Sequence, residues 1–163
     1  MTLPVSLASW RSIVCAMVAT VCASAASAQS EGGLYIAGAG FSFKTAAGRA
    51  MSQNPGGRKF FLLSLPPETA ALATTANRTL STLRDRVVAA NGVLLVCQRD
   101  IDNGKLKAGG LAPGVVAVRG WPRQGSNELP EGQRYFAGED PAQLPAANEA
   151  LRQLRSTCAE PTR

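Results

Sequence analysis

The amino-acid sequence predicts an α/β fold, a three-layer sandwich built on a mainly parallel sheet. Two apolar runs, Lys59–Leu65 and Val93–Cys97, show no alternation of polar and apolar residues, as is typical of strands covered on both faces. Helical periodicity fills the segment between them. The expected order is strand, helix, strand, short crossover, strand and helix, and this order is typical of helices packed on both sides of a parallel sheet.

The first 28 residues are interpreted as an export signal. Arg11 supplies a positive charge, and the mostly apolar run Ile13–Ala23 is too short for a stable membrane anchor. Ala26-Ser27-Ala28 offers the small-residue cleavage pattern ahead of Gln29. We therefore expect a periplasmic or secreted protein that has no stable membrane anchor after cleavage.

Cleavage would take 28 residues from the 163 and leave a single small α/β domain, residues 29–163. Cys15 and Cys22 would be removed, and each follows valine rather than the small residue that lipidation needs. Loss of Arg11 lowers the formal net charge from +6 to +5. Acidic residues are interspersed and no Lys/Arg run occurs, so we expect no nucleic-acid partner.

The sequence contains no histidine. This excludes Ser-His-Asp and Cys-His catalysis in their usual forms, and any zinc site that uses imidazole. The two cysteines of the mature chain are too few for a cysteine-rich zinc site. We expect no metal and no cofactor, and any catalysis would have to rest on a lone thiol or on carboxylates.

The first half of the domain is predicted to begin with a short strand at Leu34–Ala37 and a helical stretch near Thr45–Met51. A turn at Asn54–Gly57 then leads into the strand at Lys59–Leu65. These elements form the first strand–helix–strand unit of the predicted sandwich.

A single helix is predicted from Pro66-Pro67-Glu68 to Ala90. Proline and an acidic residue suit the start of a helix, and Asn91-Gly92 suits its end. One face of this helix carries apolar residues at helical spacing: Ala76, Leu80, Leu83 and Val87.

After the strand at Val93–Cys97, Pro113 announces a further strand at Gly114–Arg119. The stretch Gly120–Asp140 is rich in glycine, proline and polar residues, and we expect it to be a long surface excursion. A last helix is predicted from about Pro145, and its apolar face carries Ala147, Leu151, Leu154 and Cys158.

Cys97 and Cys158 are the two cysteines of the predicted mature chain. An even count in an oxidising compartment favours one disulfide between them. The alternative is that Cys97 is a free, reactive thiol with a pKa depressed by nearby Arg99. The carboxyl end of a parallel strand, where Cys97 lies, is where α/β folds place ligands and reactive groups.

Three motifs resemble binding or modification sites but depart from the required pattern. Gly38–Thr45 resembles a phosphate-binding loop, yet Phe43 stands where a glycine is needed. Asp100–Gly104 resembles the start of a calcium loop but lacks a third carboxylate, so a turn is the better interpretation. The sequon Asn77–Thr79 falls on a predicted helix, and we expect it to carry no sugar.

The surface excursion carries aromatic and guanidinium groups that are typical of protein interfaces. The candidate interaction residues are Trp121, Arg123, Arg134 and Tyr135. The alternative is that Trp121 and Phe136 fold back and hold the excursion against the core.

The segment Leu80–Val118 resembles the DsrE-like family of small α/β sulfur-relay proteins. The similarity rests on Gly92–Cys97, a Gly-Val step into a strand that ends in cysteine, and on Leu111–Val115, which contains Pro-Gly-Val. The resemblance implies a flavodoxin-like sandwich, frequent homo-oligomers, and persulfide sulfur carried on Cys97. The tail departs from the family pattern, and a bridge from Cys158 would exclude sulfur transfer in the oxidised state.

These observations favour an exported, disulfide-stabilised accessory or binding protein with a protein partner and no catalytic activity of its own. The first alternative is a DsrE-like protein that handles sulfur or thiols through Cys97. The second alternative is a periplasmic component of a secretion or conjugation apparatus.

Overall fold

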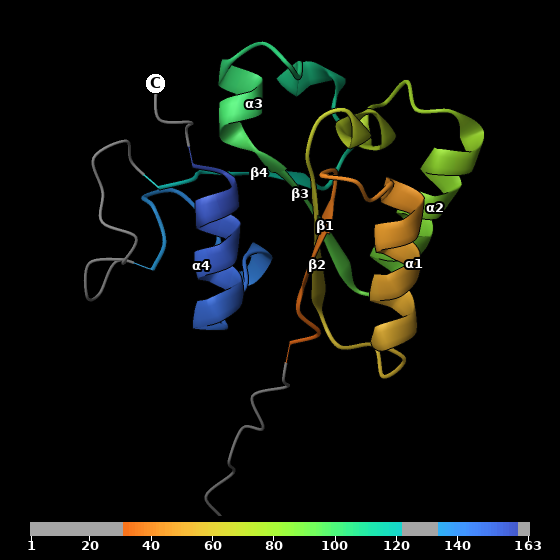
Figure 1. Cartoon of the computed structure of the whole chain (residues 1–163), viewed down its shortest axis with the longest axis horizontal. Coiled ribbons are helices and arrows are strands. Elements are labelled where there is room, and N and C mark those ends of the chain that lie inside the picture. The colour runs from red at the N-terminus through yellow and green to blue at the C-terminus, as the bar shows by residue number, and fades with distance from the viewer. Residues whose placement is uncertain (1–30, 122–133, 160–163) are drawn as a thin grey trace, which may run out of the picture.

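The computed structural model describes residues 31–121 and 134–159, so the predicted export signal and Arg123 lie outside the described residues. Figure 1 shows the arrangement of the elements. In chain order they are β1 (Leu34–Ala37), α1 (Phe43–Gln53), β2 (Phe60–Ser64), η1 (Glu68–Leu72), α2 (Arg78–Ala89), β3 (Gly92–Cys97), α3 (Gln98–Asp102), η2 (Ala108–Gly110), β4 (Val115–Val118), η3 (Pro141–Gln143) and α4 (Asn148–Thr157).

The four strands form one sheet in the order β1-β2-β3-β4, and every neighbouring pair is parallel. Helices α1 and α2 cover one face of the sheet, and α4 covers the other (Figure 1). The predicted three-layer α/β fold with a parallel sheet is therefore confirmed. Because the order of the four described strands never reverses, the described sheet has no topological switch point, the place where doubly wound sheets open a ligand crevice.

The sheet buries apolar side chains on both faces, which explains the unbroken apolar runs. Phe60 and Leu62 of β2 belong to the core beneath α1 and α2. Their neighbours Phe61 and Leu63 point the other way, into the core beneath α4. All four side chains are fully buried, so β2 is an interior strand with both faces covered.

The single helix predicted from Pro66 to Ala90 is wrong, because two helical elements replace it. A 3-10 turn, η1, ends at Leu72, and α2 starts only at Arg78. Asn77 is the N-cap of α2, and its side-chain oxygen accepts a hydrogen bond from the Leu80 N–H at 3.0 Å. Ala76 therefore lies outside the helix, whereas Leu80, Leu83 and Val87 pack in the core: the periodicity was correct but the start was not.

Helix α1 begins two residues earlier than predicted. Ser42 caps it by accepting a hydrogen bond from the Thr45 N–H at 3.1 Å, and Phe43 is fully buried in the core. The Phe43 N–H donates to the Glu68 carboxylate at 2.7 Å. The segment that resembled a phosphate-binding loop thus directs this amide to a carboxylate of the protein itself.

Two further boundaries differ from the prediction. Asp100–Gly104 was expected to be a turn, but its first three residues belong to the short helix α3, and the chain turns at Asn103 and Gly104. The last helix begins at Asn148 rather than near Pro145. Among residues 31–121 and 134–159, no helix combines the length and hydrophobicity that a membrane span requires.

Candidate functional site

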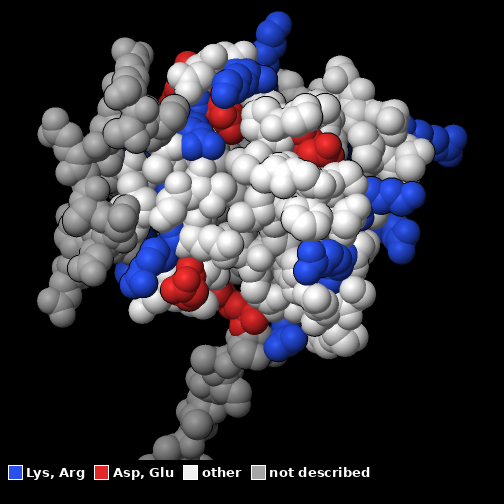
Figure 2. Space-filling model, in the orientation of Figure 1, with Lys and Arg blue, Asp and Glu red and all other residues white. Residues whose placement is uncertain are grey.

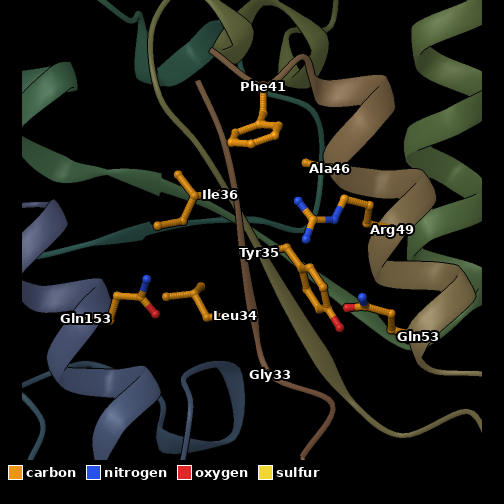
Figure 3. A pocket seen from close by; sticks show the side chains of 9 residues that line it. All are labelled: Gly33, Leu34, Tyr35, Ile36, Phe41, Ala46, Arg49, Gln53 and Gln153. Atoms are coloured by element: carbon orange, nitrogen blue, oxygen red, sulfur yellow. The ribbon is translucent and has the colours of Figure 1, made fainter. Parts of the chain in front are cut away.

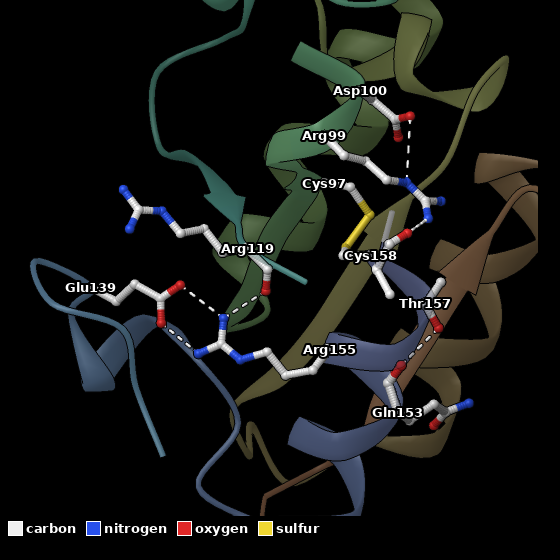
Figure 4. Close-up of a disulfide and its surroundings, with 10 residues drawn as sticks. Cys97, Arg99, Asp100, Arg119, Glu139, Gln153, Arg155, Thr157 and Cys158 are labelled. Atoms are coloured by element: carbon white, nitrogen blue, oxygen red, sulfur yellow. Dashed lines mark hydrogen bonds and ion pairs between the residues drawn. A yellow bond between two sulfur atoms is a disulfide. The ribbon is translucent and has the colours of Figure 1, made fainter. Parts of the chain in front are cut away.

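The carboxyl end of β3 and the end of α4 are joined by the Cys97–Cys158 disulfide (Figure 4). The S–S distance is 2.05 Å, the Cα atoms are 5.1 Å apart, and both cysteines are buried. The predicted bridge is confirmed in the structure. In this state neither sulfur is a nucleophile, because the thiolate is the reactive form.

Gly120 allows the chain after β4 to pass close to the backbone of Cys158 and Ala159. A Cβ atom at this position would lie 2.1 Å from the backbone carbonyl of Cys158, so a side chain cannot be accommodated without moving backbone. The next residue, Trp121, donates its N–H to the Arg155 carbonyl at 3.3 Å. The close approach of the two segments explains why glycine precedes the tryptophan.

Trp121 follows the second of the two predicted alternatives and folds back onto the protein. Its side chain is 7% exposed, and its indole N–H donates to the Ser156 hydroxyl at 3.1 Å. A buried tryptophan is not available as an interface anchor in this conformation. Its role here is to hold the segment after β4 against α4.

We expect Trp121→Phe to lower the free energy of unfolding by at least about 1 kcal/mol, since it removes this hydrogen bond and part of a buried ring. Urea unfolding of the variant measures the change. Ser156→Ala removes the same bond from the other side, and the two substitutions combined should cost less than the sum of each alone. Additive losses would contradict the bond.

Arg134 and Tyr135 also contact the protein itself. The Arg134 guanidinium donates to the Ala146 carbonyl, and the Tyr135 hydroxyl donates to the Pro145 carbonyl at 3.4 Å. Arg134 is exposed and Tyr135 is half-buried against the core beneath α4. Trp121 thus contacts the last turn of α4, whereas Arg134 and Tyr135 contact the segment just before α4, so the described ends of the excursion are attached to the sandwich at different places.

A buried ion pair between Arg155 and Glu139, which sequence reasoning missed, completes this attachment (Figure 4). The Arg155 guanidinium is fully buried and donates to the two Glu139 carboxylate oxygens at 2.8 and 2.5 Å. It also donates to the Arg119 carbonyl at 2.7 Å and lies 4.6 Å above the Phe136 ring. The available signal was its place in α4, four residues after Leu151 on the buried face.

The carboxyl of Glu139 has a pKa below its ordinary value. Burial by itself raises the pKa, but the hydrogen bonds from Arg155 and the Phe136 N–H outweigh it, with the attraction of the Arg155 charge. The Phe136 N–H donates to Glu139 at 3.1 Å. Glu139 is therefore held ionised by the folded state.

This pKa makes stability depend on pH in a defined direction. Because the pKa of Glu139 is lower in the folded than in the unfolded protein, its contribution is complete at neutral pH and is lost as the pH falls through the folded-state pKa. We expect the free energy of unfolding to decline below about pH 5. In Glu139→Gln the decline should be shallower, and equal slopes for the two proteins would contradict the assignment.

Arg99, which was predicted to depress the pKa of Cys97, has other partners. Its guanidinium donates to the Ala159 carbonyl and lies 3.8 Å from the carboxylate of Asp100. Asp100 is only 2% exposed. Arg99 therefore contributes to the attachment of the end of α4.

A groove of about 440 Å³ runs along the outer edge of β1 (Figure 3). Helix α1 contributes Arg49 and Gln53 to one wall, and α4 contributes Gln153 to the other. Leu34 and Ile36 point from β1 towards the α4 side (Figure 3). Figure 2 shows the same face of the molecule, where uncharged residues cover the middle and charged side chains stand mostly around it.

Comparison of the chain with protein-family models, curated proteins and solved structures found no match. The resemblance to the DsrE-like family therefore stays a prediction. In the part of the chain that the structure describes, no group of three His, Cys, Asp or Glu side chains is placed to hold a metal ion.

Proposed function

We propose that this protein is an exported, disulfide-stabilised α/β binding protein, without catalytic activity of its own, that recognises a segment of a protein partner. The groove along β1 is the observation that carries the proposal. It combines an outer sheet edge, apolar side chains from β1 and one guanidinium in a single open site. Such a combination of an apolar surface and a few placed polar groups is typical of recognition sites.

The chemistry of the residues supports binding rather than catalysis. The Cys97 sulfur is bonded to the sulfur of Cys158, and the chain has no histidine to act as a base. The groove itself is lined by aliphatic, aromatic, amide and guanidinium groups, and none of the nine residues that line it is acidic. These groups can orient a ligand by contact and hydrogen bonding.

Two independent features support export. The first 28 residues have the charge, apolar run and small-residue site of a leader. The disulfide between Cys97 and Cys158 is the kind of bond that forms and persists in oxidising compartments. The predicted leader and the disulfide are consistent with each other.

The sulfur-handling alternative would need the disulfide to open. One observation favours it: Cys97 ends β3 at the carboxyl edge of the sheet, the usual position of reactive groups in α/β folds. Its sulfur would then have Cys158 as a resolving partner. Because the bridge is buried and closed, this activity is proposed only for a reduced form.

Panning a random peptide display library on the purified, oxidised protein tests the proposed function. We expect peptides to be enriched that bind the wild-type protein and fail to bind Gln53→Trp, which places a large ring in the groove. Ser52→Trp is the matched control, since Ser52 is exposed on the same helix and does not line the groove. No enrichment, or equal binding to both variants, would contradict the proposal.

A further inference from the structure

We propose that the groove takes an extended peptide as a fifth strand beside β1, with an acidic side chain paired to Arg49 and an apolar residue on each side of it. This inference rests on the proposed function and names the class of ligand. It follows from the backbone of β1, from the side chains on its two faces, and from the charge of the groove.

The backbone of β1 has hydrogen-bonding groups that its sheet does not use. The carbonyls of Gly33 and Ala37 accept from the β2 side at 3.0 and 2.9 Å. Alternate residues of a strand direct their amide groups to opposite sides, so Leu34 and Ile36 direct both N–H and C=O away from β2. An extended peptide that pairs with such an edge gains main-chain hydrogen bonds.

The opposite edge of the sheet is situated differently. Residues 137–144 lie along β4, and the hollow of about 410 Å³ on that side is bounded by them as well as by β4. Among the described residues, no comparable segment lies along β1, because its groove is bounded by the two helices and by Phe41. Among the described residues, the β1 edge is therefore the edge that has no further segment of the chain beside it.

The side chains of β1 define the pattern of the added strand. Tyr35 packs on the side of α1, whereas Leu34 and Ile36 pack on the side of α4. Residues directly opposite each other in a sheet share a face. A peptide residue opposite Tyr35 would thus face Arg49, and its two neighbours would lie beside Leu34 and Ile36. The predicted pattern is apolar, acidic, apolar.

Arg49 supplies the charge that selects an acidic residue. It is exposed, it points into the groove, and its guanidinium lies 5.7 Å from the ring of Phe41 (Figure 3). Within the described ranges, no carboxylate lies at ion-pair distance from it. Phe41 is itself 50% exposed and supports the cation from one side. A carboxylate is the partner whose geometry and charge match a guanidinium.

The same charge disfavours a second copy of this chain as the occupant. Two β1 strands paired antiparallel about a twofold axis near Tyr35 would keep the α1 faces on the same side. Arg49 of each copy would then approach its counterpart. Like charges placed opposite each other are unfavourable, and the chain carries a net positive charge. An acidic peptide fits the site better than this chain does.

The test uses the full, oxidised protein and the labelled peptide Ser-Thr-Ile-Glu-Ile-Thr-Ser, with fluorescence anisotropy as the readout. We expect Arg49→Glu to weaken binding at least about tenfold, the loss of one charge-assisted hydrogen bond. The variant should prefer the same peptide with lysine in place of glutamate. Arg86→Glu is the charge-matched control, since Arg86 is exposed on α2 outside the groove, and it should bind like the wild type.

N-methylated peptides test whether the ligand binds as a strand. Amide N–H groups of alternate peptide residues face β1, so methylation of one alternating set should abolish binding and methylation of the other set should leave it within about twofold. Tolerance of methylation at both sets would overturn strand pairing. This measurement uses the wild-type protein, so a variant that fails to fold cannot explain the result.

The outcomes separate this inference from the proposed function. If enriched library peptides bind the groove but are not acidic, or bind Arg49→Glu unchanged, the inference is overturned while the proposed function stands. If no peptide binds the groove at all, both fail. Self-association through β1, detected by sedimentation and abolished by Gln53→Trp but not by Ser52→Trp, would identify a second copy as the occupant and overturn the acidic peptide.

Discussion

Reduction of the Cys97–Cys158 disulfide is expected to lower the free energy of unfolding by about 4 kcal/mol. The bond closes a loop between residues that are 61 positions apart, and opening it restores the conformational freedom of that loop in the unfolded chain. It also releases the end of α4 from β3. Urea unfolding with and without a thiol reductant measures the difference.

The double variant Cys97→Ala/Cys158→Ala controls for effects of the reductant on the rest of the protein. It should resemble the reduced wild type in stability, and its unfolding curve should not respond to reductant. A wild-type protein that unfolds at the same urea concentration in both conditions would show that the bridge contributes little. That result would remove the structural role assigned to Cys97.

Arg155→Ala is expected to lower the free energy of unfolding by about 3–5 kcal/mol, the range for breaking a buried ion pair. The substitution leaves the Glu139 carboxylate, only 11% exposed, without its cation. It also removes the donor to the Arg119 carbonyl and the contact with Phe136. Thermal or urea unfolding, followed by circular dichroism, is the measurement.

Arg152→Ala is the matched control on the same helix. Arg152 forms an ion pair with Glu149 at 3.7 Å, but both side chains are largely exposed, and such pairs contribute about 1 kcal/mol or less. Pairing Arg155→Met with Glu139→Leu should recover part of the loss by removing the uncompensated charge. Equal losses for Arg155→Ala and Arg152→Ala would contradict the buried pair.

Elements whose residues are almost all apolar could be predicted from the sequence. Phe60–Ser64 and Gly92–Cys97 are strands because their apolar runs are buried on both faces of the sheet, and they leave no competing pattern. The break before α2 was missed because the decisive signal is a single capping side chain, Asn77, inside a helical periodicity. A capping hydrogen bond depends on a single side chain, so the periodic pattern of apolar residues does not reveal where the helix begins.

The candidate site was harder to predict than the fold. The pairing of Cys97 and Cys158 was favoured by the cysteine count and the predicted compartment, with a free Cys97 thiol as the alternative. By contrast, Arg155 and Glu139 meet only because the segment that carries Glu139 lies against α4, and the burial of Trp121 depends on its contact with the same helix. The groove at β1 depends on which strand lies at the edge. That order is a property of the assembled sheet.

The two sides of the molecule therefore have different roles in this account. Around α4, three contacts hold the C-terminal segment against the sheet: the disulfide, the hydrogen bond of the predicted interface residue Trp121, and the ion pair of Arg155. At β1, backbone groups and the Arg49 guanidinium face outward without an equivalent attachment among the described residues. Stability and binding are thus expected to respond to separate sets of substitutions.

Amide hydrogen exchange of the oxidised protein, measured with and without a library-selected peptide, tests the central claim of binding at β1 most directly. Slowed exchange at the Leu34 and Ile36 amides, with no change in β4, is the predicted result. Slowed exchange in β4 or residues 137–144 while β1 is unchanged would contradict the account.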